Sequence, residues 1–448
     1  MPETTMTNLY AEHLTRLADF GRRALEHSRA QGAEFAGIVF HAGSVEYYHA
    51  DDHPVHFHSV PHFARYVPIA GPDHLLVWTP GASRLRLIEV VPTDYWFEPF
   101  AKLEHPYREH MDIVTVESAQ AAIAAIGAVP RHAYIGNDPK VGAALGLAPA
   151  AIQPPELVGA LDWYRAYKTD YEVDCLRAAA RIGANGYRAA AQGFHARASE
   201  RELFIAFQDA TQQYVPDLAF NPIIGWDEMS SVLHYQSKRA TRPRPAHTLL
   251  VDAGARAFGY ASDTTRTWCH DGCDPVFRAI LARLDALQLE LCARCRPGQD
   301  YVELHDEATR GIARILVDAG VLKISATDAF ERRLVWPFFP HGLGHHLGLQ
   351  VHDVGGKLHA PGTQIVPPPE RAPHLRTTRP LEVGHVVTIE PGIYFIPMLL
   401  APHRTGRDAA AFHWPLIDRL IPCGGMRIED DVLVTSGAPV NLTRPAMG

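Results

Sequence analysis

A short segment of the chain concentrates imidazole side chains. Residues 340–353 read Pro-His-Gly-Leu-Gly-His-His-Leu-Gly-Leu-Gln-Val-His-Asp, with histidines at positions 341, 345, 346 and 352. The glycines among them disfavour a helix, at about 1 kcal/mol each, and permit close backbone approach that a side chain would block. The segment therefore predicts a loop that presents neutral imidazole to a metal or a substrate. The alternative is a polar turn in which each histidine is structural.

Four carboxylates lie in or beside stretches whose composition is typical of strands. They are Asp252 after Leu249-Leu250-Val251, Asp263 before Thr264-Thr265, Glu390 after Val386-Val387-Thr388-Ile389, and Glu429 after Met426-Arg427-Ile428. A buried, unpaired carboxylate costs several kcal/mol, so such acids need a cation or a shared proton. An ordinary ion pair explains one of them. Four, together with an imidazole, match the ligand set of two divalent ions such as Mn²⁺, Co²⁺ or Zn²⁺.

The order and local sequence of five residues resemble a known ligand set. Asp252, Asp263, His345, Glu390 and Glu429 are similar to the dimetal ligands of the pita-bread metallopeptidases, and more closely to those of bacterial Xaa-Pro dipeptidases (prolidases). Similar runs also occur at residues 51–54, 232–235, 341–353, 388–395 and 424–430. The resemblance extends over nearly the whole chain. It implies metal-dependent hydrolysis of Xaa-Pro dipeptides, with release of C-terminal proline.

The resemblance implies a division of labour among the five ligands. Asp263 and Glu429 would bridge two divalent ions per subunit, Asp252 would chelate one ion, and His345 with Glu390 would complete the other. Mn²⁺ is the expected metal, with Co²⁺ or Zn²⁺ as alternatives. Two such ions, about 3.5–4 Å apart, bind a water molecule between them and lower its pKa, so that hydroxide is available for attack at neutral pH. Glu390 would also act as the general base.

Further residues match catalytic and substrate-binding positions of the same family. His352 and His234 would polarise the scissile carbonyl and stabilise the oxyanion. Arg376 would bind the C-terminal carboxylate of the dipeptide, and Arg427 would support the metal-binding carboxylates and the substrate. Asp52, in the turn at residues 51–54, would help to close the active site of a partner subunit. Each of these side chains, considered alone, also fits a structural role.

Phe220 departs from the family pattern. It stands fourteen residues before His234, where many members carry a tyrosine. If the missing hydroxyl binds a metal ligand or the oxyanion, its loss lowers the rate by about 10²–10³, as in oxyanion-hole deletions. We therefore expect reduced activity or a shifted substrate preference. Related prolidases hydrolyse organophosphate triesters, so such a side activity is also expected.

Two alternative functions agree with the same motifs. One is an aminopeptidase P-like Xaa-Pro exopeptidase that acts on longer peptides, against which Arg376 favours dipeptides. The other is a non-catalytic pita-bread domain that binds peptides, against which the five intact ligands argue. The sequence alone leaves both open.

The elements around these motifs suggest two domains. In residues 1–160 the pattern predicts helices over residues 9–30 and 118–126 and strands over 37–41, 75–79, 86–91 and 133–136. This alternation predicts an α/β N-terminal, creatinase-like domain that serves as scaffold and dimerisation unit. Gln153-Pro154-Pro155 resembles a linker, and a helix over residues 163–177 is expected to open the catalytic domain. Residues 161–448 are expected to form the α+β pita-bread catalytic domain. The resemblance implies a homodimer.

Composition excludes several other classes of protein. The chain has 448 residues, 47% hydrophobic and 21% charged, and a formal net charge of −8, so it carries no nucleic-acid-binding signature. It shows neither a secretory signal nor an apolar run of the roughly 18 residues that a membrane helix needs. These features predict a cytoplasmic protein without membrane or nucleic-acid partners. The six cysteines are too few and too dispersed for a disulfide framework.

Overall fold

The structure, a computed structural model, describes residues 3–96, 103, 105–244 and 246–448. Its residues group into two compact units. The amino-terminal unit runs to Glu172 and includes Leu358–Ile365, and the carboxy-terminal unit comprises the rest. The expected boundary at residue 160 falls inside helix α5 (Pro155–Arg165). The assignment of residues 1–160 and 161–448 as separate scaffold and catalytic domains stays a prediction.

The amino-terminal unit is built on a mixed sheet with the strand order β4-β3-β2-β1-β5. The strands are β1 (Gly37–His41), β2 (Leu75–Trp78), β3 (Leu85–Val90), β4 (Met111–Val116) and β5 (His132–Ile135). The helices are α1 (Glu3–Ala30), α2 (Pro61–Ala64), α3 (Ala119–Ile126), α4 (Pro139–Ala144) and α5. The pairs β1–β5 and β3–β4 are parallel. This arrangement confirms the predicted α/β character of the unit.

Strand β4 was not predicted from the sequence. It pairs only with β3 in this sheet order, and most of its residues are partly or fully exposed. Because an edge strand of this kind buries few side chains, its sequence lacks the apolar run that marks the inner strands β1 and β2.

The single helix expected over residues 163–177 is divided in the structure. Helix α5 ends at Arg165, and α6 (Asp170–His195) begins after Thr169. Glu172 Oε2 accepts a hydrogen bond from Thr169 N at 2.9 Å, and Thr169 Oγ1 accepts one from Glu172 N at 3.3 Å. This reciprocal capping box explains why a new helix starts there.

The buried His13 makes the stability of the amino-terminal unit depend on pH. His13 Nδ1 lies 2.7 Å from Thr169 Oγ1 and Nε2 lies 2.7 Å from Arg65 O, and burial lowers the pKa of this imidazole to about 4. Its unfolded-state pKa is about 6.5. Between these values the unfolded chain binds a proton that the folded unit excludes, so acidification favours unfolding.

We therefore expect His13 to lower the free energy of unfolding by up to about 3 kcal/mol as the pH falls from 6.5 to 4. Urea unfolding at pH 7.5 and pH 5, followed by fluorescence, measures the change. His13→Gln retains an amide that hydrogen-bonds without titrating, so this variant should lose less stability on acidification. Equal losses in both proteins would contradict the assignment.

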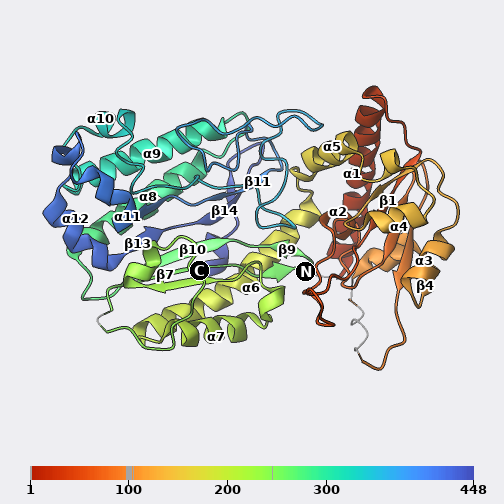
Figure 1. Ribbon diagram of the computed structural model, residues 1–448, viewed down its shortest axis with the longest axis horizontal. Helices are drawn as coiled ribbons and strands as arrows, with labels where there is room; N and C mark the ends of the chain where they lie inside the picture. The colour runs from red at the N-terminus through yellow and green to blue at the C-terminus, as the bar shows by residue number, and fades with distance from the viewer. Residues whose placement is uncertain (1–2, 97–102, 104, 245) are drawn as a thin grey trace. The chain divides into compact units, whose positions relative to one another are not determined.

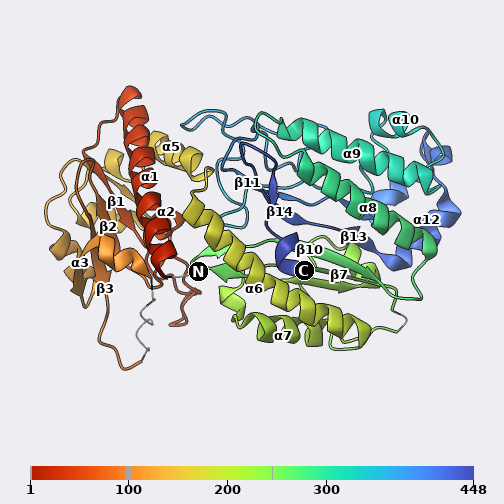
Figure 2. The ribbon, with the colours of Figure 1, turned by 180° about the vertical axis from the view of Figure 1, so that it is seen from behind.

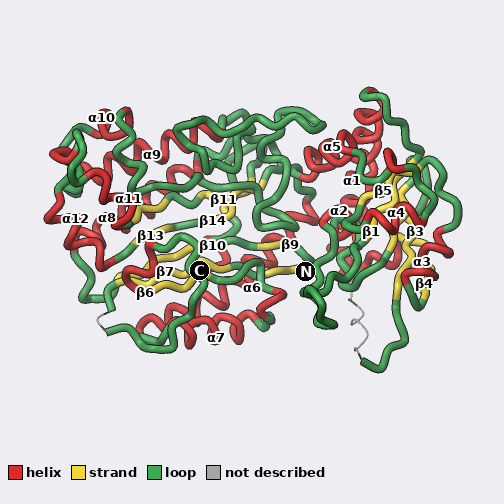
Figure 3. The backbone as a smooth tube through the Cα atoms, viewed as in Figure 1, coloured by secondary structure: helices red, strands yellow, loops and turns green. Residues whose placement is uncertain are grey.

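The carboxy-terminal unit carries its strands in small sheets, drawn in yellow in Figure 3. One sheet has the order β10-β7-β6 and another the order β11-β14-β15, while β12 pairs with β13 and β8 with β9. The strands are β6 (Ile223–Trp226), β7 (Thr248–Ala253), β8 (Arg256–Ala257), β9 (Tyr260–Ala261), β10 (Thr264–Cys269), β11 (Val386–Ile389), β12 (Gly392–Tyr394), β13 (Gly425–Arg427), β14 (Asp430–Leu433) and β15 (Val440–Asn441).

Helices cover these strands in two pairs (Figures 1 and 2). Helices α6 and α7 (Glu200–Thr211) pack on β6 and β7 through a core that includes Phe194, Phe207 and Val251. Helices α8 (Pro275–Ala293) and α9 (Tyr301–Asp318) form a larger core with β11 and β12. The remaining helices are α10 (Ala326–Glu331), α11 (Pro397–Leu400), α12 (Trp414–Leu420) and α13 (Arg444–Met447). Packing against these helices holds the strands, and therefore their ends, in place.

The helices of the described residues include none long and apolar enough to cross a membrane.

Candidate metal centre

A hairpin of the carboxy-terminal unit brings two of the predicted ligands together. Asp252 is the penultimate residue of β7, and Asp263 immediately precedes β10. The two strands pair antiparallel with Thr265 opposite Asp252. A Cβ atom at Gly254 would lie 1.9 Å from Ser262 O, so the close approach of the segments that bear the acids requires glycine there.

A second strand pair supplies the other two carboxylates. Glu390 directly follows β11, and Glu429 lies between β13 and β14. β11 and β14 pair antiparallel with Ile389 opposite Asp430, so the two glutamates leave neighbouring strand ends. Glu429 N also donates to Thr265 O at 3.1 Å, which joins this pair of strands to the β7–β10 hairpin.

The histidine-rich loop lies against β11. His345 N donates to Thr388 Oγ1 at 3.1 Å, and Thr388 N donates to His345 O at 2.9 Å. A Cβ atom at Gly344 would lie 2.1 Å from Thr388 O, so only glycine permits this approach. The prediction that these glycines allow the loop to approach another segment is confirmed at this position.

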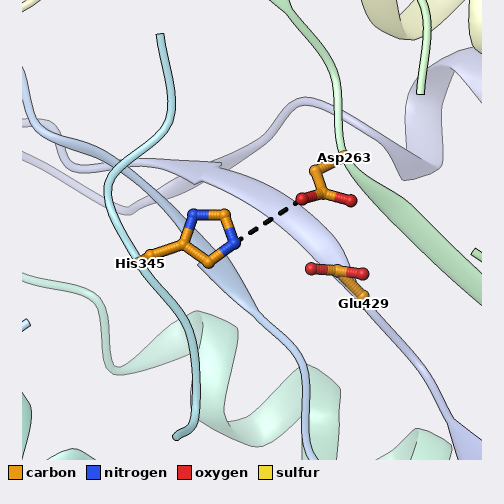
Figure 4. Close-up of side chains that lie close together, drawn as sticks. All are labelled: Asp263, His345 and Glu429. Atoms are coloured by element: carbon orange, nitrogen blue, oxygen red, sulfur yellow. Dashed lines mark ion pairs between the residues drawn. The ribbon is translucent and has the colours of Figure 1, made fainter. Parts of the chain in front are cut away.

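Asp263, His345 and Glu429 point toward one another in the interior (Figure 4). One potential ligand atom of each lies within 4.8 Å of those of the other two, and all three residues are buried. His345 Nε2 is 3.5 Å from Asp263 Oδ2 and 3.7 Å from Glu390 Oε1. His345 Nδ1 lies 3.0 Å from the carbonyl oxygen of His346 and donates to it. This bond leaves the Nε2 lone pair directed at the carboxylates, as metal binding requires.

The environment of these acids fits divalent cations. Asp252 Oδ1 and Asp263 Oδ1 are buried and have no hydrogen-bond partner among the described residues. Burial, reinforced by the charges of the neighbouring carboxylates, raises the pKa of Asp263 and of Glu429 well above the usual range. Burial also raises the pKa of Glu390. Bound cations would neutralise this repulsion and give the orphaned oxygens a partner, so the oxygen and imidazole donors here fit divalent metal ions.

Polar residues around the cluster form hydrogen bonds to the predicted ligands. Arg427 donates through Nη2 to Asp252 Oδ2 and through Nη1 to the Tyr394 hydroxyl, both at 2.5 Å. Thr265 Oγ1 accepts from Arg427 Nε at 3.0 Å and donates to Glu429 Oε2 at 2.6 Å. The structure thus places Arg427 against the predicted ligand Asp252, while its contact with substrate stays a prediction. The sequence reasoning gave no role to Thr265 or Tyr394.

Asp431 is a further buried carboxylate that sequence reasoning missed. Its Oδ2 accepts from Asp263 N at 3.1 Å. Burial raises the pKa of this carboxyl well above its usual range. In the sequence, two aspartates follow Glu429, and nothing distinguishes them from ordinary acids at a strand edge. Only the pairing of the strands shows that Asp431 contacts Asp263.

A cavity of about 750 Å³ opens onto the cluster. Besides the five predicted ligands, it is lined by Phe220, His234, His352, Arg376 and Arg427. The rings of His345 and His352 meet edge to face at 4.5 Å. Burial lowers the pKa of His352 to about 3, so its imidazole is neutral at physiological pH. His234 and Arg376 are exposed at the cavity wall.

His341 lies beside the predicted ligand Glu390, whereas Asp52 belongs to the amino-terminal unit. His341 Nε2 is 3.0 Å from the Tyr394 hydroxyl, and its Nδ1 is 3.7 Å from Glu390 Oε2. Asp52 belongs to the amino-terminal unit and is exposed, in a turn where Asp51 Oδ1 accepts from His53 N at 3.1 Å. The expected contribution of Asp52 to substrate binding stays a prediction.

Profiles of two protein families match the chain. That of metallopeptidase family M24 matches residues 174–436, and that of the Xaa-Pro dipeptidase N-terminal domain matches residues 8–163. Among curated proteins, the Xaa-Pro dipeptidase of Stenotrophomonas maltophilia (strain K279a) is 39% identical over 439 residues, which cover 98% of this chain and 97% of that protein. The Xaa-Pro dipeptidase of Marinobacter nauticus is 38% identical over 446 residues and covers 99% of both chains.

Solved structures share the fold. Aminopeptidase P from E. coli with the inhibitor Pro-Leu superimposes with a TM-score of 0.71 at 22% identity, over 96% of this chain and 95% of that one. Pseudomonas aeruginosa aminopeptidase PepP gives a TM-score of 0.70 at 22% identity, over 98% and 95% of the two chains. The expected architecture, an α/β N-terminal domain followed by a pita-bread domain, is confirmed.

Proposed function

Because the chain belongs to metallopeptidase family M24, we propose that it hydrolyses Xaa-Pro dipeptides in a metal-dependent reaction that releases proline. The observation that carries this proposal is the buried cluster of Asp263, His345 and Glu429 at the cavity. The relatives named Xaa-Pro dipeptidase, similar over nearly their whole length, support the substrate class.

The proposed ligands of two divalent ions are Asp252, Asp263, His345, Glu390 and Glu429. Such ions, when bound, lower the pKa of a coordinated water and polarise the carbonyl oxygen of the substrate. The oxygen-rich ligand set is compatible with Mn²⁺, our first choice, and with Co²⁺ or Zn²⁺.

Glu390 and two histidines would supply the proton transfer and the polarisation. Glu390 takes a proton from the attacking water and delivers it to the proline nitrogen, a tertiary amide nitrogen that leaves readily only when protonated. His352, neutral because burial lowers its pKa to about 3, donates an N–H to the developing oxyanion. His234, on the wall of the same cavity, is the proposed second donor.

Arg376 would select dipeptides. Its guanidinium, exposed on the cavity wall, is proposed to bind the substrate's terminal carboxylate in a bidentate pair. Only in a dipeptide does that carboxylate belong to the proline next to the scissile bond. This selection argues for a dipeptidase over an exopeptidase that acts on longer peptides.

We expect Arg376→Met to raise KM for Ala-Pro by about 10–100-fold with a smaller change in kcat, because a charge-assisted pair contributes about 1.5–3 kcal/mol. KM for Ala-prolinamide, which lacks the carboxylate, should change little. Steady-state kinetics on both substrates measure the difference. Arg371→Met is the matched control, since this exposed arginine pairs with Asp306 instead. An equal loss on both substrates would overturn the role.

Phe220, half-buried in the cavity wall, is the proposed cause of reduced or shifted activity. We expect Phe220→Tyr to raise kcat/KM for Xaa-Pro by about tenfold or more, since one oxyanion donor contributes about 10²–10³. The rate of proline release measures the gain. Phe204→Tyr, in the α6–α7 core, controls for an added hydroxyl elsewhere. Unchanged turnover in Phe220→Tyr would disprove this attribution.

The primary experiment is hydrolysis of Gly-Pro, Ala-Pro and Leu-Pro by metal-stripped protein, with Mn²⁺, Co²⁺ or Zn²⁺ added back. We expect proline release that depends on the added metal and is absent in Asp263→Asn. Two metals bound per chain without release from any dipeptide would reject the proposed substrate, and Xaa-Pro-Yaa peptides and phosphotriesters would be tested next. A homodimer, the role of Asp52 within it and a cytoplasmic location stay predictions.

A further inference from the structure

Three cysteines from two separate segments converge in the carboxy-terminal unit. Cys269 ends β10, Cys273 follows it after a turn, and Cys423 ends the 3₁₀-helix Ile421–Cys423. The thiols of Cys269 and Cys273 are hydrogen-bonded to each other, and so are those of Cys273 and Cys423. Cys273 therefore lies between two other thiols, and all three are free.

The turn after β10 holds the first pair together. Cys273 N donates to His270 O at 2.8 Å, and His270 N donates to His247 O at 2.7 Å. The Cys273 thiol has a second acceptor in Asp274 O, 3.7 Å away. Cys269 and Cys273 thus flank one turn whose residues Asp271 and Gly272 are exposed, whereas Cys423 comes from a distant, buried segment.

The three thiols differ in access and acidity. Cys269 is partly exposed, whereas Cys273 is 6% and Cys423 3% exposed. The hydrogen bond from Cys273 lowers the pKa of Cys269 against the opposing effect of burial, and the charge of Arg278 assists. The same hydrogen bond raises the pKa of Cys273 to about 12. A thiolate therefore forms first on the most accessible sulfur, which is the form that peroxides oxidise.

We propose that Cys269 and Cys273 form a reversible peroxide-sensitive dithiol site. The Cys269 thiolate attacks one oxygen of hydrogen peroxide, the O–O bond breaks, and hydroxide leaves while sulfenic acid forms on sulfur. The Cys273 sulfur then attacks that sulfur and expels a second hydroxide as the disulfide forms. The two protons given up by the thiols convert both hydroxides to water, so two thiols and one peroxide yield one disulfide and two waters.

This site is separate from the metal centre. Asp263 precedes the first residue of β10 and Cys269 is its last, and a strand advances about 3.3 Å per residue. Asp252 and Glu429 lie opposite Thr265, four residues before Cys269, so the dithiol is separated from the nearest proposed ligands by roughly 13 Å of strand. Its oxidation can be measured on the protein itself, without any assay of hydrolysis, and its test does not depend on the proposed function.

Trypsin provides a direct measurement. Cleavage after Arg266 and Arg278 releases residues 267–278, which contain Cys269 and Cys273, and cleavage after Arg419 and Arg427 releases residues 420–427, which contain Cys423. After stepwise addition of hydrogen peroxide and alkylation of the remaining thiols, we expect peptide 267–278 to lose the mass of two hydrogens. Dithiothreitol added before alkylation should reverse this loss. Cys292 and Cys295, three residues apart and buried, are an internal control that should stay reduced.

Variants distinguish the two thiols. Cys269→Ser should slow peroxide consumption by the protein about tenfold, because the accessible thiolate is lost. Cys273→Ser should still consume peroxide but should accumulate sulfenic or sulfinic acid on Cys269, and Cys423→Ser should behave as wild type. Oxidation of Cys292 and Cys295 as fast as Cys269, a cross-link between peptides 267–278 and 420–427, or only sulfinic acid on wild-type Cys269 would each overturn the proposal.

Discussion

Replacing Asp263 by asparagine is expected to abolish metal-dependent Xaa-Pro hydrolysis, with kcat/KM reduced by about 10³-fold or more. The substitution removes a charge from the centre of the cluster, where His345 Nε2 lies 3.5 Å from Asp263 Oδ2. Metal activation of water lowers the activation barrier by several kcal/mol, and each 1.36 kcal/mol is a factor of ten in rate. Kinetics at saturating Mn²⁺, with elemental analysis of the bound metal, measure both losses.

The stability of this variant distinguishes lost metal binding from misfolding. Metal-free wild-type protein keeps mutually repelling buried carboxylates, so metal-free Asp263→Asn should be at least as stable. Added metal should stabilise wild type by mass action and leave the variant unchanged. The matched control is Asp227→Asn, since Asp227 is also buried but binds the backbone N–H groups of His247 and Thr248. Full metal content in Asp263→Asn would refute its role as a ligand.

Glu390→Gln is expected to lower kcat by about 10²–10⁴, the usual contribution of a general base. The glutamine retains an oxygen that can coordinate a cation, so metal content should fall far less than kcat. Single-turnover rates of proline release, compared with the number of metal ions bound, measure the two effects separately.

Glu429→Gln provides the comparison, because a carboxylate that bridges two ions uses both oxygens and an amide retains only one, so metal and activity should be lost together. Glu429 also accepts the 2.6 Å hydrogen bond from Thr265, which an amide oxygen can still accept, so the local fold should persist. If metal content and kcat fell in parallel in Glu390→Gln as well, Glu390 would be a ligand without a role in proton transfer.

The sequence singled out the carboxylates and the histidine that the structure brings together, but not the polar residues that contact them. A carboxylate in an apolar strand is conspicuous because its burial is costly, and a loop rich in glycine and histidine is unsuited to a core. Thr265 and Tyr394, by contrast, are ordinary strand residues. Their roles arise only when Thr265 lies opposite Glu429 and when the Tyr394 hydroxyl meets Arg427.

Helices and strands were likewise predictable where their side chains are buried, and less so where they are not. The inner strands β1 and β2 and the helix α3 were predicted because their apolar pattern reports burial. Strand β4, at an edge, and the break between α5 and α6 depend on a neighbouring strand and on one capping box. Both features are set by a few hydrogen bonds that leave little trace in the hydrophobic pattern.

The spacing of the proposed ligands along the chain bears on the order in which the protein folds and binds metal. Asp252 and Glu429 delimit a span that contains α8, α9 and the histidine loop. Its ends meet because both residues lie opposite Thr265 and because Arg427 pairs with Asp252. Closing so long a loop costs about 5 kcal/mol of chain entropy, which strand pairing and core packing offset on folding. The dispersed ligands of an unfolded chain, by contrast, offer a metal ion no preformed site. The chain should therefore fold before it binds metal. In refolding experiments, the rate of recovering native secondary structure should not depend on metal concentration, whereas the final recovery of activity should.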